Sequence, residues 1–250
     1  MKKHRSSQFL AICTAAVLAL SVPAWASQVS ITPLDTGNTT SSQSQSGASE
    51  PSTAQNTSGQ TVDISSITKP TVASQGAVLL NAADGSVLFS KNGDTTYYPA
   101  SITKLMTALL VAENCNLDDT VTFSATATTN LESGAVSIGM AEGDTMTVRQ
   151  CLYALLLKSA NEVGNALAEH VAGSNAAFAE KMNAKAASLG CTNTHFANPH
   201  GLNDPNHYTT PHDMALIARA AFANDIVKTV ASTRTYTLPA TKNNPSGLTV

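Results

Sequence analysis

A proline followed by an apolar stripe of helical spacing constrains the fold of this chain most. Apolar residues recur at i, i+3, i+4, i+7 and i+8, the spacing of one helix face: Ile102, Leu105, Met106, Leu109 and Leu110. Pro99 stands just before the stripe, where its missing N–H costs a first helical turn nothing. The pattern predicts a helix that begins near Ser101, ends near Asn114 and anchors its apolar face in a core.

Ser101 and Lys104 are three residues apart at the start of this predicted helix. Residues at that spacing project from the same side of a helix, here the flank of the apolar stripe. A serine hydroxyl is a poor nucleophile until a base removes its proton, and a neutral lysine amine is such a base. The free backbone N–H groups of a helix start also suit a developing oxyanion. Ser101 is therefore a candidate nucleophile and Lys104 its candidate base.

The same four letters, Ser-Ile-Thr-Lys, also occur at residues 66–69, without the same context. There Lys69 precedes Pro70, which disfavours a helical conformation at the lysine. No apolar stripe follows that copy. The tetrapeptide alone is thus compatible with a solvated helix start, and the surrounding pattern makes the second copy the candidate site.

Residues 1–26 have the three parts of a secretory signal peptide. Basic residues stand at the start, an apolar stretch spans 9–22, and Ala24-Trp25-Ala26 is a small-x-small cleavage site. An uncleaved membrane anchor is the alternative, but the apolar run is short for a span and is broken by Ser21 and Pro23. We therefore expect export, to the cell wall or the outer face of the cytoplasmic membrane.

Two further parts follow the predicted signal. Residues 27–68 are rich in Ser, Thr, Gln and Gly, so they cannot bury enough apolar surface to order themselves and are expected to form a disordered tether. Residues 69–250 carry strand patterns near both ends and helix patterns between, which predicts an α+β domain rather than alternating βαβ units. We expect strands at 77–80, 86–89 and 233–238, and helices beginning at Thr147, Ser174 and Thr210.

Charge and cysteine usage narrow the possible partners. The net charge is −3 and no basic run follows the signal, which argues against nucleic acid as a partner. After the signal, the candidate metal ligands and thiols are Cys115, Cys151, Cys191, His195, His200, His207 and His212. Their spacings match neither a common zinc pattern nor a disulfide framework. We therefore expect inert thiols, a structural role for His200 and no metal site, with a metal site as the weaker alternative.

A second polar group, Ser159-Ala160-Asn161, stands between two apolar helical segments. Ser159 and Glu162 have the spacing of a capping box, so one interpretation is that Ser159 caps the next helix. The other is that the interhelical turn holds these polar side chains at the edge of a cleft. The two interpretations are compatible.

These segments together resemble the low-molecular-weight penicillin-binding proteins, the D-alanyl-D-alanine carboxypeptidases of peptidase family S11. The resemblance runs from about Gly76 to the end of the chain, with Glu162 where an aspartate is common. Its segments are Tyr98-Pro99-Ala100-Ser101-Ile102-Thr103-Lys104, Lys158-Ser159-Ala160-Asn161, Asn198-Pro199-His200-Gly201-Leu202 and His207-Tyr208-Thr209-Thr210.

The resemblance implies a fold, a reaction and roles for four residues. The fold is that of the penicillin-binding proteins and serine β-lactamases, an antiparallel sheet flanked by helices. Ser101 would attack the D-Ala-D-Ala end of peptidoglycan stem peptides, and Lys104, kept neutral by partial burial and nearby positive potential, would take its proton. Ser159 would relay a proton, and Asn161 would bind the substrate amide and orient Lys104. No cofactor is implied, and β-lactams would be inhibitors.

One family motif, Lys-Thr-Gly, is missing. Lys228-Thr229-Val230 lacks the glycine and has the pattern of a helix end. We therefore expect the domain to be truncated at its C-terminus, inside a strand. Membrane association through a C-terminal anchor, which relatives often carry, is a further expectation from the resemblance.

Two other functions stay open at this point. A serine β-lactamase of related fold would use a glutamate to clear its acyl-enzyme. The glutamates after Asn161 are Glu162, Glu169 and Glu180, all in helical patterns. A non-catalytic protein that binds the wall is the third possibility, since the Lys-Thr-Gly motif is absent.

Overall fold

The computed structural model describes residues 54–55, 61–62, 70–129 and 131–250. The predicted signal peptide lies outside the described residues. So does most of the predicted tether, of which β1 (Ala54–Gln55) and β2 (Thr61–Val62) form an antiparallel pair. The residues from Val72 to Val250 form a unit of their own, which carries the candidate site.

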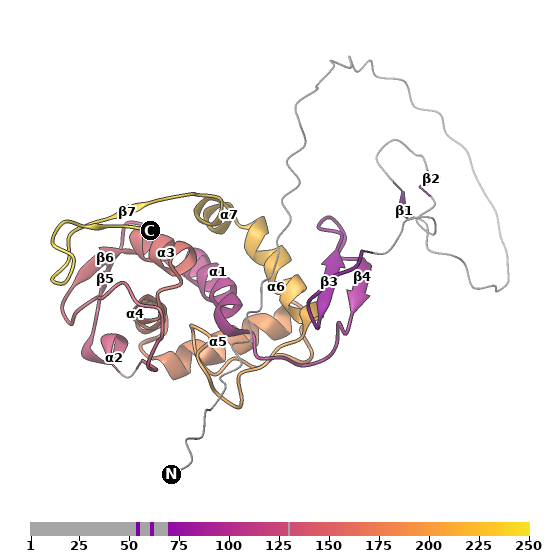
Figure 1. The fold of residues 1–250 in the computed structure, drawn as a ribbon, viewed down its shortest axis with the longest axis horizontal. Coiled ribbons are helices and arrows are strands. Elements are labelled where there is room, and N and C mark those ends of the chain that lie inside the picture. Colours follow the sequence, from indigo (N-terminus) through magenta and orange to yellow (C-terminus); the bar gives the residue numbers. More distant parts are fainter. Residues whose placement is uncertain (1–53, 56–60, 63–69, 130) are drawn as a thin grey trace, which may run out of the picture. The chain divides into compact units, whose positions relative to one another are not determined.

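Within this unit, short antiparallel strand pairs stand near both ends of the chain and between helices (Figure 1). The strands pair as β3 (Ala77–Leu80) with β4 (Val87–Lys91), β5 (Thr120–Thr122) with β6 (Thr145–Thr147), and β7 (Thr237–Leu238) with β8 (Leu248–Thr249). The helices are α1 (Lys104–Asn114), α2 (Ala125–Thr128), α3 (Val148–Leu157), α4 (Asn161–Ala172), α5 (Asn175–Ser188), α6 (Pro211–Ala223) and α7 (Asp225–Ala231). The α+β prediction is confirmed, with the described strands in separate pairs.

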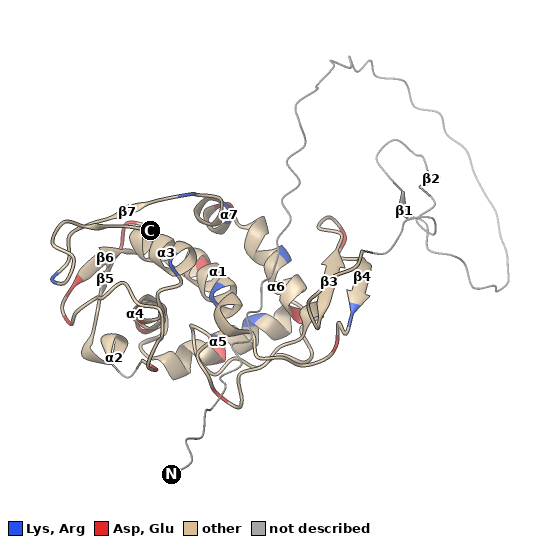
Figure 2. Cartoon of the chain, in the orientation of Figure 1, with Lys and Arg blue, Asp and Glu red and all other residues tan. Residues whose placement is uncertain are grey.

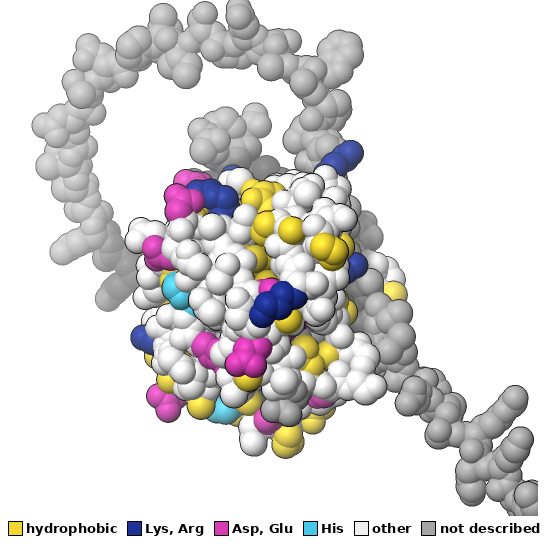
Figure 3. Space-filling model, turned by 90° about the vertical axis from the view of Figure 1, so that its left-hand side faces the viewer, with side chains coloured by type: hydrophobic (Ala, Val, Ile, Leu, Met, Phe, Trp, Pro, Cys, Tyr) yellow, Lys and Arg dark blue, Asp and Glu magenta, His cyan; other side chains and the backbone are white. Residues whose placement is uncertain are grey.

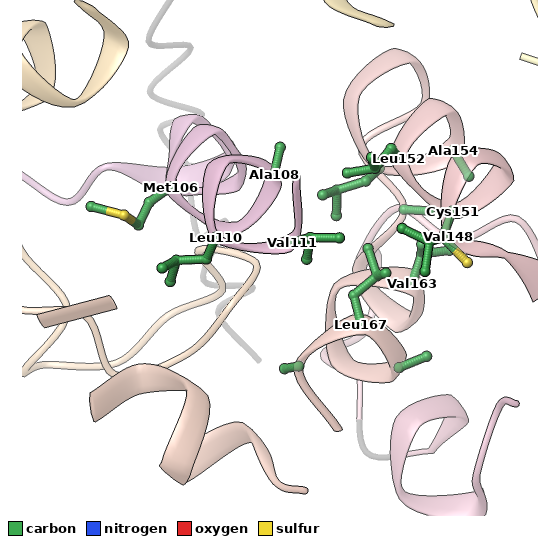
Figure 4. Packing of buried hydrophobic residues seen from close by; sticks show 14 of the residues in the cluster. Met106, Ala108, Leu110, Val111, Val148, Cys151, Leu152, Ala154, Val163 and Leu167 are labelled. Atoms are coloured by element: carbon green, nitrogen blue, oxygen red, sulfur yellow. The ribbon is translucent and has the colours of Figure 1, made fainter. Parts of the chain in front are cut away.

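Helix α1 is the centre of the unit and contacts α3, α4, α5, α6 and α7. Its burial extends beyond the predicted stripe, because Ala108 and Val111 are also fully buried. Figure 4 shows Val111 of α1 facing Leu152 of α3 and Val163 of α4. Each such buried aliphatic side chain contributes about 1.5–3 kcal/mol. The helix predicted to be amphipathic is thus a core helix.

Three predicted helix starts are confirmed in their details. Thr147 and Gln150 form a reciprocal capping box at α3, while Ser174 accepts a backbone hydrogen bond at the start of α5. Thr210 does the same for α6, with Pro211 at the first helical position. Each cap satisfies an otherwise unpaired N–H group and contributes about 1 kcal/mol. These caps fix where the helices that surround α1 begin.

The start of α1 differs from the prediction. Residues Ala100–Thr103 form a 3₁₀ turn, η2, and the α-helix begins only at Lys104. No side chain caps either element. The predicted end at Asn114 is confirmed.

Charged side chains of both signs are interspersed along the helices (Figure 2). On the face seen in Figure 3, hydrophobic side chains lie between polar and charged ones. In the part of the chain that the structure describes, no helix combines the length and apolarity needed to cross a bilayer.

The three described cysteines are free thiols. Cys151 is fully buried, and Cys115 and Cys191 are partly buried. Burial raises the pKa of the Cys191 thiol to about 12, with the Asp213 carboxylate adding to the effect. Such thiols are poor nucleophiles, in line with the expectation from the sequence.

Candidate active site

The structure brings together the four residues that the sequence analysis named. Ser101 comes from η2, Lys104 from the first turn of α1, Ser159 from the turn after α3, and Asn161 from the start of α4. Lys104 Nζ lies 3.3 Å from Ser101 Oγ and donates to Asn161 Oδ1 at 2.8 Å. Ser159 Oγ donates to Ser101 Oγ at 2.9 Å. A hydroxyl, an amine, a second hydroxyl and an amide thus form one connected group.

A strained turn presents Ser101. Ala100, the residue before it, has φ of 50°, a left-handed conformation that costs an L-residue about 1–2 kcal/mol. Gly201 packs against this turn so closely that a Cβ there would lie 1.9 Å from the Ala100 carbonyl oxygen. Gly201 also has φ of 87°, so only glycine fits without strain. The Asn198–Leu202 segment therefore supports the turn that carries Ser101.

Ser159 also has a left-handed backbone, with φ of 63°. It follows the end of α3, where the N–H groups of Lys158 and Ala160 both donate to the Ala154 carbonyl. Glycine usually occupies such a helix stop. The capping interpretation is wrong, because the N-cap of α4 is Ala160 and its start has no side-chain cap. Ser159 instead directs its hydroxyl to Ser101.

The surroundings of Lys104 match a neutral amine. Its side chain is only 2% exposed, and Nζ donates to Asn161 Oδ1 at 2.8 Å and to the His200 carbonyl oxygen at 2.7 Å. Both of these oxygens can only accept, so they use the two N–H groups of a neutral amine. In the neutral form the lone pair is then left for the third neighbour, the hydroxyl of Ser101, whereas the protonated form donates its third N–H to this hydroxyl. The neutral form has the arrangement that a general base requires.

Burial lowers the pKa of Lys104 to about 8, while the nearby Glu162 carboxylate raises it in part. The sequence analysis expected burial and positive potential to act together. The charge that acts on Lys104 is instead negative, so burial alone accounts for the lowered pKa.

Asn161 is held at both ends of its side chain. Oδ1 accepts from Lys104, and Nδ2 donates to the Val136 carbonyl at 2.9 Å. The backbone N–H of Asn161 donates to the same carbonyl at 3.0 Å. Because neither end is free, the amide has one orientation, with its oxygen toward the amine.

Hydrogen bonds that the sequence did not predict join the loop that carries His200 and His207 to η2 and α1. His207 Nδ1 accepts from the Ala197 N–H at 3.0 Å, so Nε2 carries the proton that it donates to Thr103 Oγ1 at 2.8 Å. Thr107 Oγ1 donates to the Pro199 carbonyl at 2.6 Å. No local spacing predicts the Thr103–His207 and Thr107–Pro199 pairs, since about a hundred residues separate the partners in sequence. The only indication in the sequence was that these residues lie in segments that resemble the family.

Both buried imidazoles are neutral. Burial lowers the pKa of His200 to about 3 and that of His207 to about 4. His200 Nδ1 accepts from the Leu202 N–H at 3.1 Å, which fits the structural role expected for it. Within the described ranges, no cluster of three His, Cys, Asp or Glu side chains has an arrangement that could hold a metal ion.

A cavity of about 250 Å³ opens beside the nucleophile. Its lining consists of the two serines, Lys104 and apolar side chains: Ser101, Ile102, Lys104, Leu105, Leu155, Leu156 and Ser159. Ser101 is exposed, whereas Lys104 behind it is not. The site thus offers a reachable hydroxyl with a base and a second proton carrier at its back, a suitable arrangement for acyl transfer.

Comparison with known proteins places this chain in a family. The peptidase S11 profile, described as D-alanyl-D-alanine carboxypeptidase, matches residues 63–245. The D-alanyl-D-alanine carboxypeptidase of Streptomyces sp. strain K15 is 39% identical over 183 residues, which cover 68% of this chain and 62% of that protein. DacF, a D-alanyl-D-alanine carboxypeptidase of Bacillus subtilis, is 38% identical over 150 residues, 58% of this chain and 38% of DacF.

The fold agrees with the sequence match. The crystal structure of the Streptomyces K15 DD-transpeptidase superposes with a TM-score of 0.64 at 35% identity, and the match covers 74% of each chain. This likeness confirms the penicillin-binding protein fold. The chain spans 62% and 38% of the length of the two curated relatives above. From its sequence and its fold, the chain belongs to the peptidase S11 family of D-alanyl-D-alanine carboxypeptidases.

Proposed function

We propose that this protein is a serine-type D-Ala-D-Ala carboxypeptidase that removes the terminal D-alanine from peptidoglycan stem peptides through an acyl-enzyme on Ser101. The observation that carries the proposal is the buried Lys104 amine, whose two N–H groups are taken by fixed acceptors next to Ser101. Membership of the S11 family supports the substrate class.

In the acylation step, Lys104 Nζ takes the proton of Ser101. Ser101 Oγ then bonds to the carbonyl carbon of the penultimate D-alanine, and the C–N bond to the terminal D-alanine breaks. Ser159, hydrogen-bonded to Ser101, relays a proton to the leaving amine. Asn161 holds Lys104 in place. By the family resemblance it also binds the substrate amide, with the second N–H of Nδ2 or the second lone pair of Oδ1. The product of this step is an ester on Ser101 and free D-alanine.

Water completes the cycle by attacking the ester, which releases the shortened peptide and returns the proton to Ser101. A β-lactam enters by the same step, since Ser101 attacks the lactam carbonyl and opens its C–N bond. The amine stays tethered to the acyl group, so it remains next to the ester. β-lactams are therefore proposed inhibitors.

The proposed place of action is outside the cytoplasm. A wall peptide is reached there, and residues 1–26 have the pattern of a secretory signal. Roles in wall biogenesis and cell shape, and membrane association through a C-terminal anchor, belong to the same proposal and rest on the family resemblance.

A second candidate reaction is D,D-transpeptidation, because one similar solved structure is titled a DD-transpeptidase. The acylation is the same, but an amine instead of water attacks the Ser101 ester. Incubation with a donor peptide and an amino acceptor distinguishes the two, since one gives a shortened peptide and the other a cross-linked product. A β-lactamase would instead turn over a chromogenic cephalosporin rapidly.

The first prediction tests the acyl-enzyme directly. Ser101→Ala should abolish covalent labelling by a fluorescent penicillin in protein expressed from the full reading frame that contains these residues. Ser66→Ala, in the other Ser-Ile-Thr-Lys copy, is the matched control and should leave labelling intact. Mass spectrometry of the labelled peptide locates the ester. Label that persists in the Ser101 variant would refute the assignment.

A further inference from the structure

Glu162, the second residue of α4, has a buried carboxylate in which one oxygen accepts several hydrogen bonds from residues that the structure describes and the other accepts none. Only 1% of the residue is exposed. Its Oε1 accepts from Ser137 Oγ at 2.6 Å, from the Ile138 N–H at 2.7 Å and from the Gly139 N–H at 3.1 Å. Oε2 is buried and has no hydrogen-bond partner among the described residues. One oxygen thus binds three consecutive residues of a single segment.

This segment also holds Asn161. The Val136 carbonyl, directly before the three residues that Glu162 binds, accepts from both the N–H and Nδ2 of Asn161. The segment has no regular secondary structure, so its polar groups depend on side chains for their partners. Asn161 and Glu162, neighbours at the start of α4, therefore both bind the segment Val136–Gly139. The position of the Asn161 side chain depends on the position in which Glu162 fixes this segment.

The turn between β7 and β8 binds two further carbonyls of the segment. Asn243 Nδ2 donates to the Gly139 carbonyl and Asn244 Nδ2 to the Ile138 carbonyl, both at 2.8 Å. The segment is thus bound by α4 and by this turn. Without Glu162, it loses three hydrogen bonds at once.

The negative charge on Glu162 has a purpose that its hydrogen bonds do not explain. A glutamine oxygen would accept the same three bonds without the cost of burying a charge, several kcal/mol in general, although its NH₂ group would replace the buried, unpartnered Oε2. No ion pair of Glu162 occurs in the described part of the chain. The carboxylate does act on Lys104 through space. His200, the other titratable group that interacts with Lys104, is neutral above about pH 3 and carries no charge in the working range.

We propose that Glu162 is a positioning residue for the acylation of Ser101: its buried carboxylate fixes residues Val136–Gly139, and these set Asn161 against the Lys104 amine. This inference rests on the proposed function. Its second consequence is electrostatic, because the same carboxylate favours the protonated form of Lys104 and so sets the pH at which the base becomes active.

Two substitutions distinguish the two roles of Glu162, which are to bind the segment Val136–Gly139 and to place a negative charge near Lys104. In Glu162→Gln the three acceptor bonds persist without the charge, so the pH midpoint of penicillin acylation should move below that of the wild type. In Glu162→Ala the segment loses its hold, so the acylation rate constant on the alkaline plateau should fall about tenfold or more. A role in stability alone predicts lower unfolding midpoints and an unmoved pH profile.

Glu169 supplies the matched control on the same helix. Its carboxylate also binds hydroxyl groups at the start of α2, Ser124 at 2.5 Å and Thr126 at 2.6 Å, and neither contact touches the site. Glu169→Gln removes the same charge from the same helix and should leave both the plateau rate and the pH midpoint unchanged.

Side-chain NMR separates this inference from the proposed function, because it needs no turnover. The Lys104 amine should titrate at lower pH in Glu162→Gln than in the wild type, and the Asn161 amide signals should shift in Glu162→Ala. If the wild type is never acylated but the Asn161 signals still shift in Glu162→Ala, the proposed function fails, whereas the dependence of the Asn161 position on Glu162 stands. If Glu162→Ala does not fold, Ser137→Ala removes one of the three hydrogen bonds instead, and the Asn161 amide signals should shift in that variant too. Asn161 amide signals that stay unchanged when these hydrogen bonds are lost would overturn the positioning role, and a Glu162→Gln protein with the wild-type Lys104 titration would overturn its electrostatic consequence.

Discussion

At the scale of single residues, the site depends on what surrounds one amine. Lys104 has three oxygen neighbours, and two of them can only accept hydrogen bonds. The third is the hydroxyl of Ser101. A protonated lysine would also satisfy all three neighbours, so the hydrogen bonds alone do not make the amine a base. Burial does, because it costs the charged form its hydration.

This burial leads to a prediction for the pH dependence of acylation. The pKa of Lys104 is lowered to about 8, so the fraction of neutral amine falls about tenfold for each pH unit below that value. The acylation rate constant should therefore rise with pH up to about 8 and then level off. Stopped-flow measurements with a fluorescent penicillin between pH 6 and 10 would show the profile.

The control is a side chain that cannot lose its proton in this range. Lys104→Arg keeps a positive charge at all accessible pH values, so it should show no acylation at any of them. A profile that is flat across pH 6–10 in the wild type would contradict the role of Lys104 as base.

At the scale of structural elements, the site rests on chain reversals rather than on regular helices. Ala100 before the nucleophile and Ser159 after α3 both have left-handed backbones. Such conformations persist only where neighbours impose them. Gly201 is the neighbour of the first, in direct contact with the Ala100 carbonyl.

Substitution of Gly201 should therefore damage stability and reactivity together. In Gly201→Ala the new Cβ would collide with the Ala100 carbonyl oxygen at 1.9 Å, and φ of 87° adds strain. We expect a loss of about 3 kcal/mol or more in the free energy of unfolding. Acylation of whatever protein folds should be slowed, because the turn that carries Ser101 has to move.

Gly173 at the end of α4 isolates the effect of backbone strain. It also has a left-handed backbone, with φ of 80°, but a Cβ there meets nothing within 4 Å. Gly173→Ala should cost only about 1–2 kcal/mol and leave acylation unchanged. Urea unfolding and penicillin labelling of both variants provide the test, and equal effects at the two positions would contradict the collision.

Sequence patterns predicted these elements unevenly, for physical reasons. The caps at Thr147, Ser174 and Thr210 depend on residues three or four positions apart, so the sequence indicates them directly. The 3₁₀ turn before α1 and the left-handed Ser159 depend on distant partners, and the sequence pointed instead to an α-helical start and a cap. Helix caps can be predicted from residues that are close in sequence, whereas backbone strain that distant residues impose cannot.

The candidate site shows the same division. The spacing of Ser101 and Lys104 predicted their proximity, and the family resemblance supplied Ser159 and Asn161. Neither indicated that Lys104 is bound by a backbone carbonyl of His200, or that Glu162 binds residues 137–139. Both contacts join segments far apart in the chain, so only the folded structure reveals them.

At the scale of the whole molecule, the loop that carries His200 and His207 links stability to pH. His200 and His207 are buried as neutral imidazoles with pKa values lowered to about 3 and about 4. In the unfolded chain their pKa is near 6.5, so between these values the unfolded state binds more protons. Stability therefore rises with pH through this window, and is lost as the pH falls from about 6.5 towards 4.

Each of the two histidines should contribute a slope of up to about 1.4 kcal/mol per pH unit in this window. His207→Gln keeps one donor and one acceptor but does not titrate, so it should remove one of the two slopes. Urea unfolding of both proteins between pH 4.5 and 7 measures the difference. Identical slopes in the wild type and His207→Gln would contradict the argument.

The long-range anchoring of Lys104 also concerns protein biosynthesis. Two of its three contacts reach 57 and 96 positions along the polypeptide. Until those distant stretches have been made and have docked, this side chain is an ordinary hydrated ammonium group and its serine neighbour is inert. On the proposed mechanism, a newly made chain therefore reacts with neither a stem peptide nor a β-lactam until it has folded.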